Sequence, residues 1–288
     1  METKGKKLRG DLMKKVLGIV ISHRKLGNSE LLVKEILNGI PEIYERELIR
    51  LTDLKIEPCR ACYRCLQPDN DCPVKDDFNF VMDRIKRADA VIIGVPVYIL
   101  GPHGYYKMLT DRLVGMGNHV KQTQGKPCAI VIPYGTKGWE GYSKAAATIM
   151  PRLLQMKIVD CWQVHSTLPG ESMLDSGNRK YARQLGQELF SGRIYQPGER
   201  DCPFCGSDLF RLRAGGKVEC PICGAKGSLD FDNIPNFSGN SHFRFSDKEV
   251  AEHFGLWLNQ MKQRFWAEKV SLLEVQKEYR DIDWWIKP

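Results

Sequence analysis

Four cysteines crowd into residues 58–73, and their spacing constrains this chain more than any other feature. They follow the pattern C-x2-C-x2-C-x6-C, with a proline after the last one, and are Cys59, Cys62, Cys65 and Cys72. The first three cannot all pair with one another as disulfides, but their thiolates can converge on one side of a tight loop. Bacterial ferredoxins hold iron–sulfur clusters with a similar run. The spacing therefore favours a [4Fe–4S] cluster, with zinc or a redox-active thiol site as the alternatives.

A second group of cysteines lies near the C-terminal third of the chain. Two C-x2-C-G knuckles contribute Cys202, Cys205, Cys220 and Cys223. Four thiolates at this spacing predict a tetrahedral metal site in a small segment that lacks a core of its own. The segment resembles a zinc ribbon, so structural zinc is expected, and a rubredoxin-like redox iron is the alternative. Eight of the ten cysteines fall into the two groups, which predicts a reducing compartment, the cytoplasm.

The overall composition is that of an ordinary soluble globular protein. The chain has 288 residues, of which 42% are hydrophobic and 27% charged, and its formal net charge is +8. The basic residues are spread along the chain, so nucleic-acid binding is not expected, whereas attraction to an acidic electron-transfer protein fits the charge. We expect no membrane association, because no run of residues approaches the ~20 apolar positions of a membrane span. No secretory signal is evident.

Short apolar segments alternate with amphipathic ones along most of the chain. Strands are predicted at residues 14–22, 44–51, 90–97, 127–133 and 158–166. Helical periodicity follows them, with apolar positions from Leu32 to Ile40 and over residues 76–87, 142–154 and 175–191. This alternation predicts an α/β fold with a five-stranded, doubly wound parallel sheet. Such sheets bind ligands at the carboxyl ends of their strands.

Three of these strand ends carry loops suited to a ligand. The first loop runs into a helix through Gly27, so free backbone N–H groups and the helix dipole form an anion site. Ser22, Arg24, Asn28 and Ser29 add polar side chains there, although Asn28 or Ser29 could serve merely as a helix cap. Residues 96–104 and 134–141 offer glycines for close approach and aromatic rings beside a flat ligand. Neither a dinucleotide-binding nor a Walker motif is present.

With the cysteine loop, these motifs resemble the iron–sulfur flavoprotein branch of the flavodoxin-like NAD(P)H-dependent FMN reductase superfamily. The resemblance covers about residues 14–191. It implies a sheet of order 2-1-3-4-5, one FMN, one [4Fe–4S] cluster, and a homodimer or homotetramer. It also implies that FMN is held by three loops, whose residues are Ser22, Arg24, Gly27, Asn28, Ser29, Pro96, Val97, Tyr98, Ile99, Tyr134, Gly135, Thr136 and Gly138.

The C-terminal part departs from that family pattern. Residues 231–244 are predicted to be a polar linker, and Ser246 to Glu249 form a capping box that opens a long helix. The apolar stripe of this helix should pack on the chain's own sheet or at a subunit interface. Its members are Val250, Phe254, Trp257, Leu258, Met261 and Phe265, and Trp284 and Trp285 are expected to anchor the tail.

We therefore divide the chain into four parts. They are a basic arm (1–13), the flavodoxin-like domain with its cysteine loop (14–195), the metal knuckle (196–230), and a linker with the C-terminal helix (231–288).

The expected function is that of an oxidoreductase that transfers electrons. A ferredoxin-like donor would reduce the cluster, and FMN would then deliver the electrons to an unidentified small-molecule or protein acceptor. One alternative is an NAD(P)H-dependent FMN or quinone reductase with structural metal sites. Another is a redox-sensing binding protein that uses its zinc ribbon. No catalytic acid or base is assigned: His103 is a lone histidine, and Cys128 and Cys161 are expected in the core.

Overall fold

The computed structural model describes residues 14–67, 70–230, 235–239 and 243–280, and its centre is a parallel sheet. The three inner strands are rich in Val and Ile and almost wholly buried, as expected for a sheet covered on both faces. The strand order is β2-β1-β3-β6-β7, which confirms the predicted order 2-1-3-4-5. The strands are β1 (Lys15–Val20), β2 (Glu45–Arg50), β3 (Ala90–Gly94), β6 (Pro127–Tyr134) and β7 (Lys157–His165).

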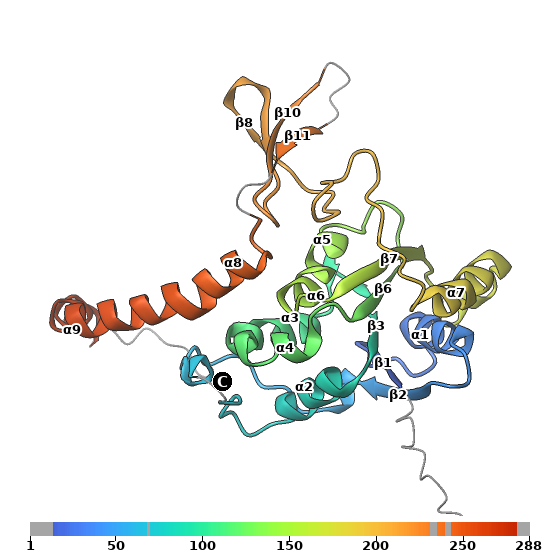
Figure 1. Cartoon of the computed structure of the whole chain (residues 1–288), viewed down its shortest axis with the longest axis horizontal. Coiled ribbons are helices and arrows are strands. Elements are labelled where there is room, and N and C mark those ends of the chain that lie inside the picture. Colours follow the sequence, from blue (N-terminus) through green and yellow to red (C-terminus); the bar gives the residue numbers. More distant parts are fainter. Residues whose placement is uncertain (1–13, 68–69, 231–234, 240–242, 281–288) are drawn as a thin grey trace, which may run out of the picture.

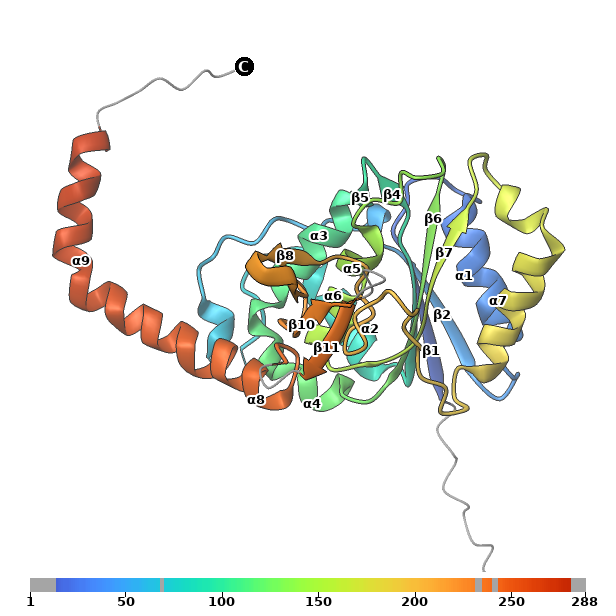
Figure 2. The same cartoon turned by 90° about the horizontal axis from the view of Figure 1, so that it is seen from above.

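Helices cover both faces of this sheet, as Figure 2 shows. Alternate side chains of β1 enter opposite cores: Val16 and Val20 pack on one side, and Leu17 and Ile19 on the other. The first side is closed by α1 (Asn28–Gly39) and α7 (Ser176–Glu188). The second side is closed by α2 (Phe78–Arg87), α3 (Gly104–Asp111), η3 (Arg112–Asn118) and α4 (Val120–Thr123), together with the helices described next.

The helix predicted over residues 142–154 is broken in two. The pieces are α5 (Ser143–Ala147) and α6 (Ile149–Leu153). Pro151 has no N–H to donate to the carbonyl of Ala147. The hydroxyl of Tyr106, on α3, donates to that carbonyl instead. A side chain distant in the sequence therefore satisfies the group that the proline leaves open.

Short elements follow several strand ends. They are η1 (Leu51–Asp53), η2 (Arg64–Leu66), the small hairpin of β4 (Val97–Tyr98) and β5 (Gly101–Pro102), and η4 (Glu171–Met173).

A four-stranded antiparallel sheet forms the ribbon above the main body (Figure 1). Its strands are β8 (Arg211–Arg213), β9 (Lys217–Glu219), β10 (Lys226–Leu229) and β11 (Pro235–Gly239), with the turn η5 (Ala214–Gly216) between β8 and β9. The prediction of a linker at 231–244 is wrong for β11. This strand pairs with β10, and its Phe237 ring lies 5.5 Å from that of Phe210. These polar residues are extended because they pair with β10, although their own sequence pattern does not indicate a strand.

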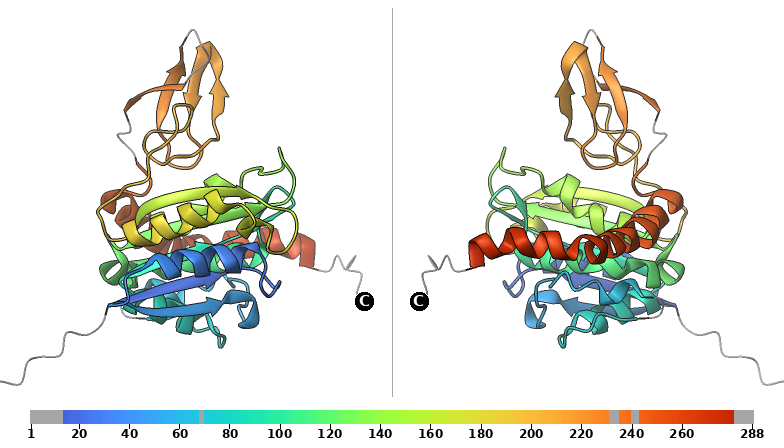
Figure 3. Two further views of the ribbon diagram at one scale, coloured as in Figure 1. Left: turned by 90° about the vertical axis from the view of Figure 1, so that its right-hand side faces the viewer. Right: turned by 90° about the vertical axis from the view of Figure 1, so that its left-hand side faces the viewer.

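A long C-terminal helix begins where the capping box predicts. The Ser246 Oγ accepts a hydrogen bond of 3.2 Å from the N–H of Glu249. The helix comprises α8 (Asp247–Val250), the π-helical segment η6 (Ala251–Trp257) and α9 (Leu258–Arg280). Figures 2 and 3 show that it starts on the main body and then leaves it.

The predicted stripe of this helix is only partly covered. Val250 is buried and Phe254 packs against the main core. Trp257 and Phe265 are exposed, so the chain's own sheet does not cover the whole stripe. Residues 1–13, Trp284 and Trp285 lie outside the described residues. None of the helices in the described part of the chain is both long and apolar enough to cross a bilayer.

Candidate functional site

A pocket of about 240 Å³ lies at the carboxyl ends of the central strands. The structure brings together most of the predicted cofactor residues there, from all three loops. Ile99, Thr136 and Gly138 are not among the lining residues, and Ile99 is 86% exposed. The predicted residues that line it are Ser22, Arg24, Gly27, Asn28, Ser29, Pro96, Val97, Tyr98, Tyr134 and Gly135.

Three further lining residues were missed from the sequence: Pro133, Ser166 and Thr167. Ser166 and Thr167 follow β7, so the rule that ligands gather at strand ends could have found them if it had been applied to the fifth strand. The Thr167 hydroxyl donates to the carbonyl of Gly135 at 2.6 Å, which joins two of the loops that line the pocket.

The N-terminus of α1 forms one wall of the pocket. Gly27 occupies the cap position, and α1 carries no side-chain cap within the described residues. The first-turn N–H groups of a helix lack partners inside the helix, and their dipoles favour an anion. The Ser22 hydroxyl accepts from the N–H of Arg24 at 3.2 Å and keeps its own proton to donate. This wall therefore has the donors that a phosphate needs.

Asn28 contributes differently from the sequence prediction, which made its side-chain amide a phosphate donor. Its Nδ2 donates to the carbonyls of Ser166 and Leu168, at 3.2 and 2.9 Å. Its Oδ1 accepts from the N–H and hydroxyl of Ser172. The side chain is thus occupied in fastening the loop after β7 to α1. The backbone N–H of Asn28 is the group that it offers to the pocket.

One polar atom beside the pocket lacks a partner. The Oγ of Ser166 is buried and makes no hydrogen bond with the described residues. A buried hydroxyl without a partner is costly, so such atoms commonly face a ligand or water. Together with the donors at α1, it shows that the residues fit a phosphorylated, hydrogen-bonding cofactor such as FMN.

A buried ion pair holds the loop before α1. The Arg50 guanidinium pairs with Glu30 and donates to the carbonyls of Ser22 and Arg24, while Glu30 accepts from the N–H of Leu26. Burial by itself would raise the pKa of the Glu30 carboxyl. Hydrogen bonds from Lys34 and Arg50 and from the Leu26 amide outweigh burial and lower that pKa to about 2.

The cysteine loop is fastened to the second side of the body. The Nδ2 of Asn118 lies 3.0–3.1 Å from the carbonyls of Cys65, Gln67 and Asn70. Gly115 lies directly against the loop: a Cβ built there would be 2.7 Å from the Cβ of Cys65 and 3.0 Å from its Sγ. The loop therefore rests on η3 through a contact that only glycine permits.

Arg112 is the strongest link between this loop and the body, and sequence reasoning missed it. Its side chain and that of Asp76 are both fully buried and form an ion pair. Its Nη2 donates to the Sγ of Cys72 at 3.0 Å, and its Nη1 donates to the carbonyl of Glu57 at 3.0 Å. The guanidinium also lies 4.2 Å from the ring centre of Phe78. The guanidinium thus places a fixed positive charge next to Cys72.

The four thiols of the loop differ in exposure. Cys59 and Cys62 are exposed, and Cys65 and Cys72 are partly buried. Burial raises the pKa of Cys65, and the nearby thiols of Cys72, Cys59 and Cys62 raise it further, so the other three thiols lie within electrostatic reach of Cys65. Among the described residues these sulfurs are not gathered within 4.8 Å as those of the ribbon are. A cubane places each thiolate on a different iron, so its ligands need wider spacing.

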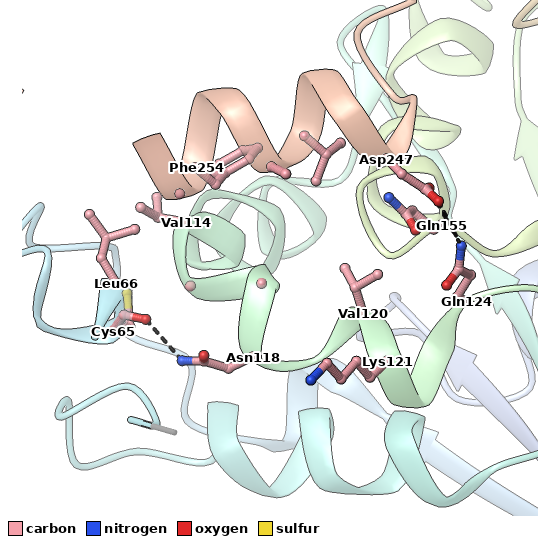
Figure 4. A pocket seen from close by; sticks show the side chains of 15 residues that line it. Cys65, Leu66, Val114, Asn118, Val120, Lys121, Gln124, Gln155, Asp247 and Phe254 are labelled. Atoms are coloured by element: carbon pink, nitrogen blue, oxygen red, sulfur yellow. Dashed lines mark hydrogen bonds between the residues drawn. The ribbon is translucent and has the colours of Figure 1, made fainter. Parts of the chain in front are cut away.

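A hollow of about 450 Å³ adjoins this loop (Figure 4). It lies between Cys65, the η3 residue Val114 and the C-terminal helix, with the ring of Phe254 on its helix side. At its far end the Gln124 amide donates to the carboxylate of Asp247. The C-terminal helix thus begins at the far end of the hollow and approaches the cysteine loop near Phe254.

The ribbon cysteines form a compact and fully buried group. All four Sγ atoms lie within 4.8 Å of one another; the Cys202–Cys223 pair is 3.6 Å apart and the Cys205–Cys220 pair 3.5 Å. Four thiolates about 2.3 Å from one zinc ion would stand about 3.8 Å apart. These spacings exceed the about 2.05 Å of a disulfide bond. The donor set therefore fits one tetrahedral metal ion.

Other singled-out residues have structural roles. His103 caps α3 by accepting from the N–H of Tyr105 at 3.2 Å. Cys128 and Cys161 are buried, as predicted for the core, and burial raises the pKa of both, that of Cys161 to about 12.

We predict that acid destabilises the loop before α1 through Glu30. The carboxyl has a lower pKa when folded, so its stabilising effect is complete above the ordinary pKa of 4.5 and is lost as pH falls towards about 2. That difference corresponds to at most roughly 3 kcal/mol. The Glu30→Gln variant should show a flatter loss of unfolding free energy between pH 5 and pH 2, measured by urea titration. An unchanged pH profile would contradict this role.

We also predict that Gly115→Ala lowers the iron bound per chain by about half or more, because the added Cβ displaces Cys65. Gly117→Ala is the matched control: it lies in the same helical segment, and a Cβ there would meet nothing within 4 Å. Iron would be measured on folded protein purified without oxygen. Equal iron in both variants would refute the importance of the contact between Gly115 and the loop.

Comparison with known proteins shows which family the chain belongs to. The model of the family described as NADPH-dependent FMN reductase matches residues 14–167. An iron–sulfur flavoprotein of Methanocaldococcus jannaschii is 43% identical over 99 residues, 34% of this chain and 51% of that protein. The chain thus matches about half the length of that relative.

Two further similarities extend into the C-terminal part of the chain. A flavone synthase of Aspergillus candidus is 28% identical over 259 residues, 75% of this chain and 77% of that protein. The solved structure of a flavone reductase has a TM-score of 0.70 and 22% identity, and covers 95% of this chain and 99% of that one. The chain therefore belongs to the NADPH-dependent FMN reductase family and has a flavodoxin-like fold.

Proposed function

We propose that this chain is an FMN-dependent oxidoreductase, an electron-transfer iron–sulfur flavoprotein. When bound, a [4Fe–4S] cluster would accept single electrons from a ferredoxin-like donor, and FMN would deliver them to an acceptor. The observation that carries the proposal is the cysteine loop, which has two thiols exposed to solvent and two anchored on the body. Similarity to an iron–sulfur flavoprotein supports it.

The residues proposed to hold FMN divide into two sets. The N–H groups of Asn28 and Ser29, with Ser22 and Arg24, would bind the phosphate. The aromatic rings that line the pocket, Tyr98 and Tyr134, would lie beside the flat ring system. Arg50 and Glu30 would keep the phosphate loop in place without touching the cofactor.

A basic hollow beside the cysteine loop supports a separate protein donor. It has a volume of about 480 Å³, and Cys62 lies in its wall. Arg60, Arg64 and Lys75 also line it, while its acidic residue Glu57 is paired with Lys55 at 3.3 Å. An acidic electron-transfer protein would be attracted to this surface and would meet the exposed side of the loop there.

We propose that the ribbon cysteines bind structural zinc. Their sulfurs are wholly buried, and the knuckle is tied to the body by the Arg152 guanidinium, which donates to the carbonyl of Cys205 at 2.6 Å. Lys144 and Asp201 add an ion pair of 2.7 Å. A metal that joins the knuckle before β8 to the knuckle between β9 and β10 would keep this small sheet folded. Redox iron at the same cysteines is the alternative.

A second candidate function is the reduction of a flat conjugated substrate. The two similarities that cover most of the chain carry the names flavone synthase and flavone reductase. An apolar hollow of about 490 Å³ lies between the body and the ribbon, with Tyr106, Tyr142 and Phe254 in its wall. Tyr142 packs on Gly101, in the hairpin that carries Tyr98. Such a hollow suits an aromatic molecule.

We predict that reversing charge at the basic hollow slows electron entry. Bound flavin in the Arg60→Glu, Arg64→Glu double variant should be reduced by ferredoxin about tenfold more slowly at low salt, because steering is lost. Arg87→Glu, Lys180→Glu is the control, since it makes the same change of charge at two exposed residues outside the hollow. Flavin bleaching would be followed by rapid mixing without oxygen.

Two outcomes would contradict the proposed electron path. Equal rates in the double variant and the control would mean that the donor docks elsewhere. Reduction by NADPH alone, at a rate as high as with ferredoxin and insensitive to salt, would favour the simple FMN or quinone reductase. Iron and flavin contents of each variant would be measured first, so that slow reduction is not mistaken for lost cofactor.

A further inference from the structure

The Arg112 side chain is wholly buried, yet one of its N–H groups has no partner among the described residues. Its Nη1 donates to the carboxylate of Asp76 and to the carbonyl of Glu57, and its Nη2 donates to the same carboxylate and to the Sγ of Cys72. The fifth donor, the N–H of Nε, makes no hydrogen bond. A buried donor without a partner is destabilising, so this one requires an explanation.

The shape of the guanidinium shows which way this group points. Its five N–H groups lie in one plane at fixed angles. The Asp76 carboxylate accepts one hydrogen bond from Nη1 and one from Nη2, so it occupies the end of the fork. The second proton of Nη2, which is directed at Cys72, therefore lies on the same edge as the N–H of Nε. Two parallel N–H groups thus face the side on which the Cys72 sulfur lies, and only one of them has a partner.

Solvent does not supply the missing partner. The side chains of Arg112 and Asp76 are both inaccessible, and the ring centre of Phe78 lies 4.2 Å from the guanidinium. The free N–H shares its edge with a cysteine that is a proposed ligand of the iron–sulfur cluster. Both the thiolates and the sulfides of such clusters accept N–H hydrogen bonds. The edge of Arg112 therefore suits a group that carries several sulfur atoms at the Cys72 position.

We propose that Arg112 raises the reduction potential of the cluster at the cysteine loop, because two N–H groups on one edge of its guanidinium donate to sulfur. This inference rests on the proposed function, since it needs an iron–sulfur cluster at these cysteines. Reduction adds negative charge, and N–H groups that point at the sulfurs stabilise the more negative state. Arg112 thus adjusts the driving force of electron transfer between the donor and FMN, in addition to holding the loop.

Other charges near the loop affect the sulfurs less directly. The guanidinium of Arg112 contacts the Cys72 Sγ at 3.0 Å, whereas the Asp76 carboxylate is bound to the opposite end of the fork. The carboxylate therefore weakens the effect without cancelling it. Arg60 and Arg64 also lie in the loop, but both are exposed and solvent screens their charges.

The test compares the reduction potential of the bound cluster in the wild type and in two variants of the full chain. Arg112→Lys keeps a positive charge beside Asp76 but removes the planar edge with its two N–H groups. Asn118→Ala is the control, because Asn118 fastens the same loop through three backbone carbonyls. The potential would be measured by redox titration without oxygen, with the reduced cluster followed by electron paramagnetic resonance.

We expect Arg112→Lys to lower the ratio of reduced to oxidised cluster about tenfold at a fixed solution potential, a shift of about 59 mV for a one-electron couple. The control should keep the wild-type ratio, because a looser loop alone removes no hydrogen bond from a sulfur. An unchanged or higher ratio in Arg112→Lys would overturn the inference. So would an equal loss in the control, since the shift would then come from loosening the loop.

Iron and acid-labile sulfide, measured first, distinguish this failure from a failure of the proposed function. A wild type without sulfide would refute the proposed function and this inference together. A wild type that carries the cluster, with the same potential in Arg112→Lys, would refute the inference alone.

A second measurement needs no substitution at Arg112. The chain would carry nitrogen-15 in its arginine guanidinium groups and the changes Arg60→Lys and Arg64→Lys, which remove the two arginines within the loop. Pulsed electron paramagnetic resonance of the reduced cluster should then detect a nitrogen-15 coupling from Arg112. Its absence would contradict the inference even if Arg112→Lys binds no cluster.

Discussion

The buried ion pair of Arg112 and Asp76 is the interaction on which the cysteine loop depends. Asp76 accepts hydrogen bonds from the N–H groups of Glu57 and Phe78, and Arg112 reaches the carbonyl of Glu57 and the Sγ of Cys72. Both ends of the loop therefore meet at one pair of charges. Breaking such a pair leaves an uncompensated buried charge, at a cost of about 3–5 kcal/mol. The described residues of the loop contain only one short helical turn, η2, so these contacts determine its shape.

The segment η3, which begins at Arg112, connects the cysteine loop to the rest of the molecule. Arg112 begins η3, whose Gly115 supports Cys65 and whose Val114 faces the hollow beneath Phe254. The cysteine loop thus rests on a segment that also supports the C-terminal helix. The proposed flavin pocket is organised separately, by Asn28 and the Arg50–Glu30 pair at the opposite helix layer. The two proposed cofactor sites therefore depend on different buried contacts.

Sequence patterns predicted those features of the fold and of the sites that depend on residues close together in the chain. Spacing alone located both cysteine groups and apolar alternation located all five strands, while the order of the strands was implied by the family resemblance. What they missed depends on partners distant in the chain. The Tyr106 hydroxyl donates to the carbonyl that Pro151 leaves without a donor, and pairing with β10 makes residues 235–239 a strand. The Asn28 side chain is hydrogen-bonded to a loop more than a hundred positions away. The role of Arg112 could not be predicted from the sequence, because Asp76 and Cys72 come next to it only in the folded chain.

Composition of the purified protein tests the central claim most directly. Iron, acid-labile sulfide, zinc and FMN would be measured per chain on material prepared without oxygen. The account predicts about four iron, four sulfide, one zinc and one FMN. Two zinc ions and no sulfide would contradict it, because the loop of Cys59 to Cys72 would then be a structural metal site with no part in electron transfer.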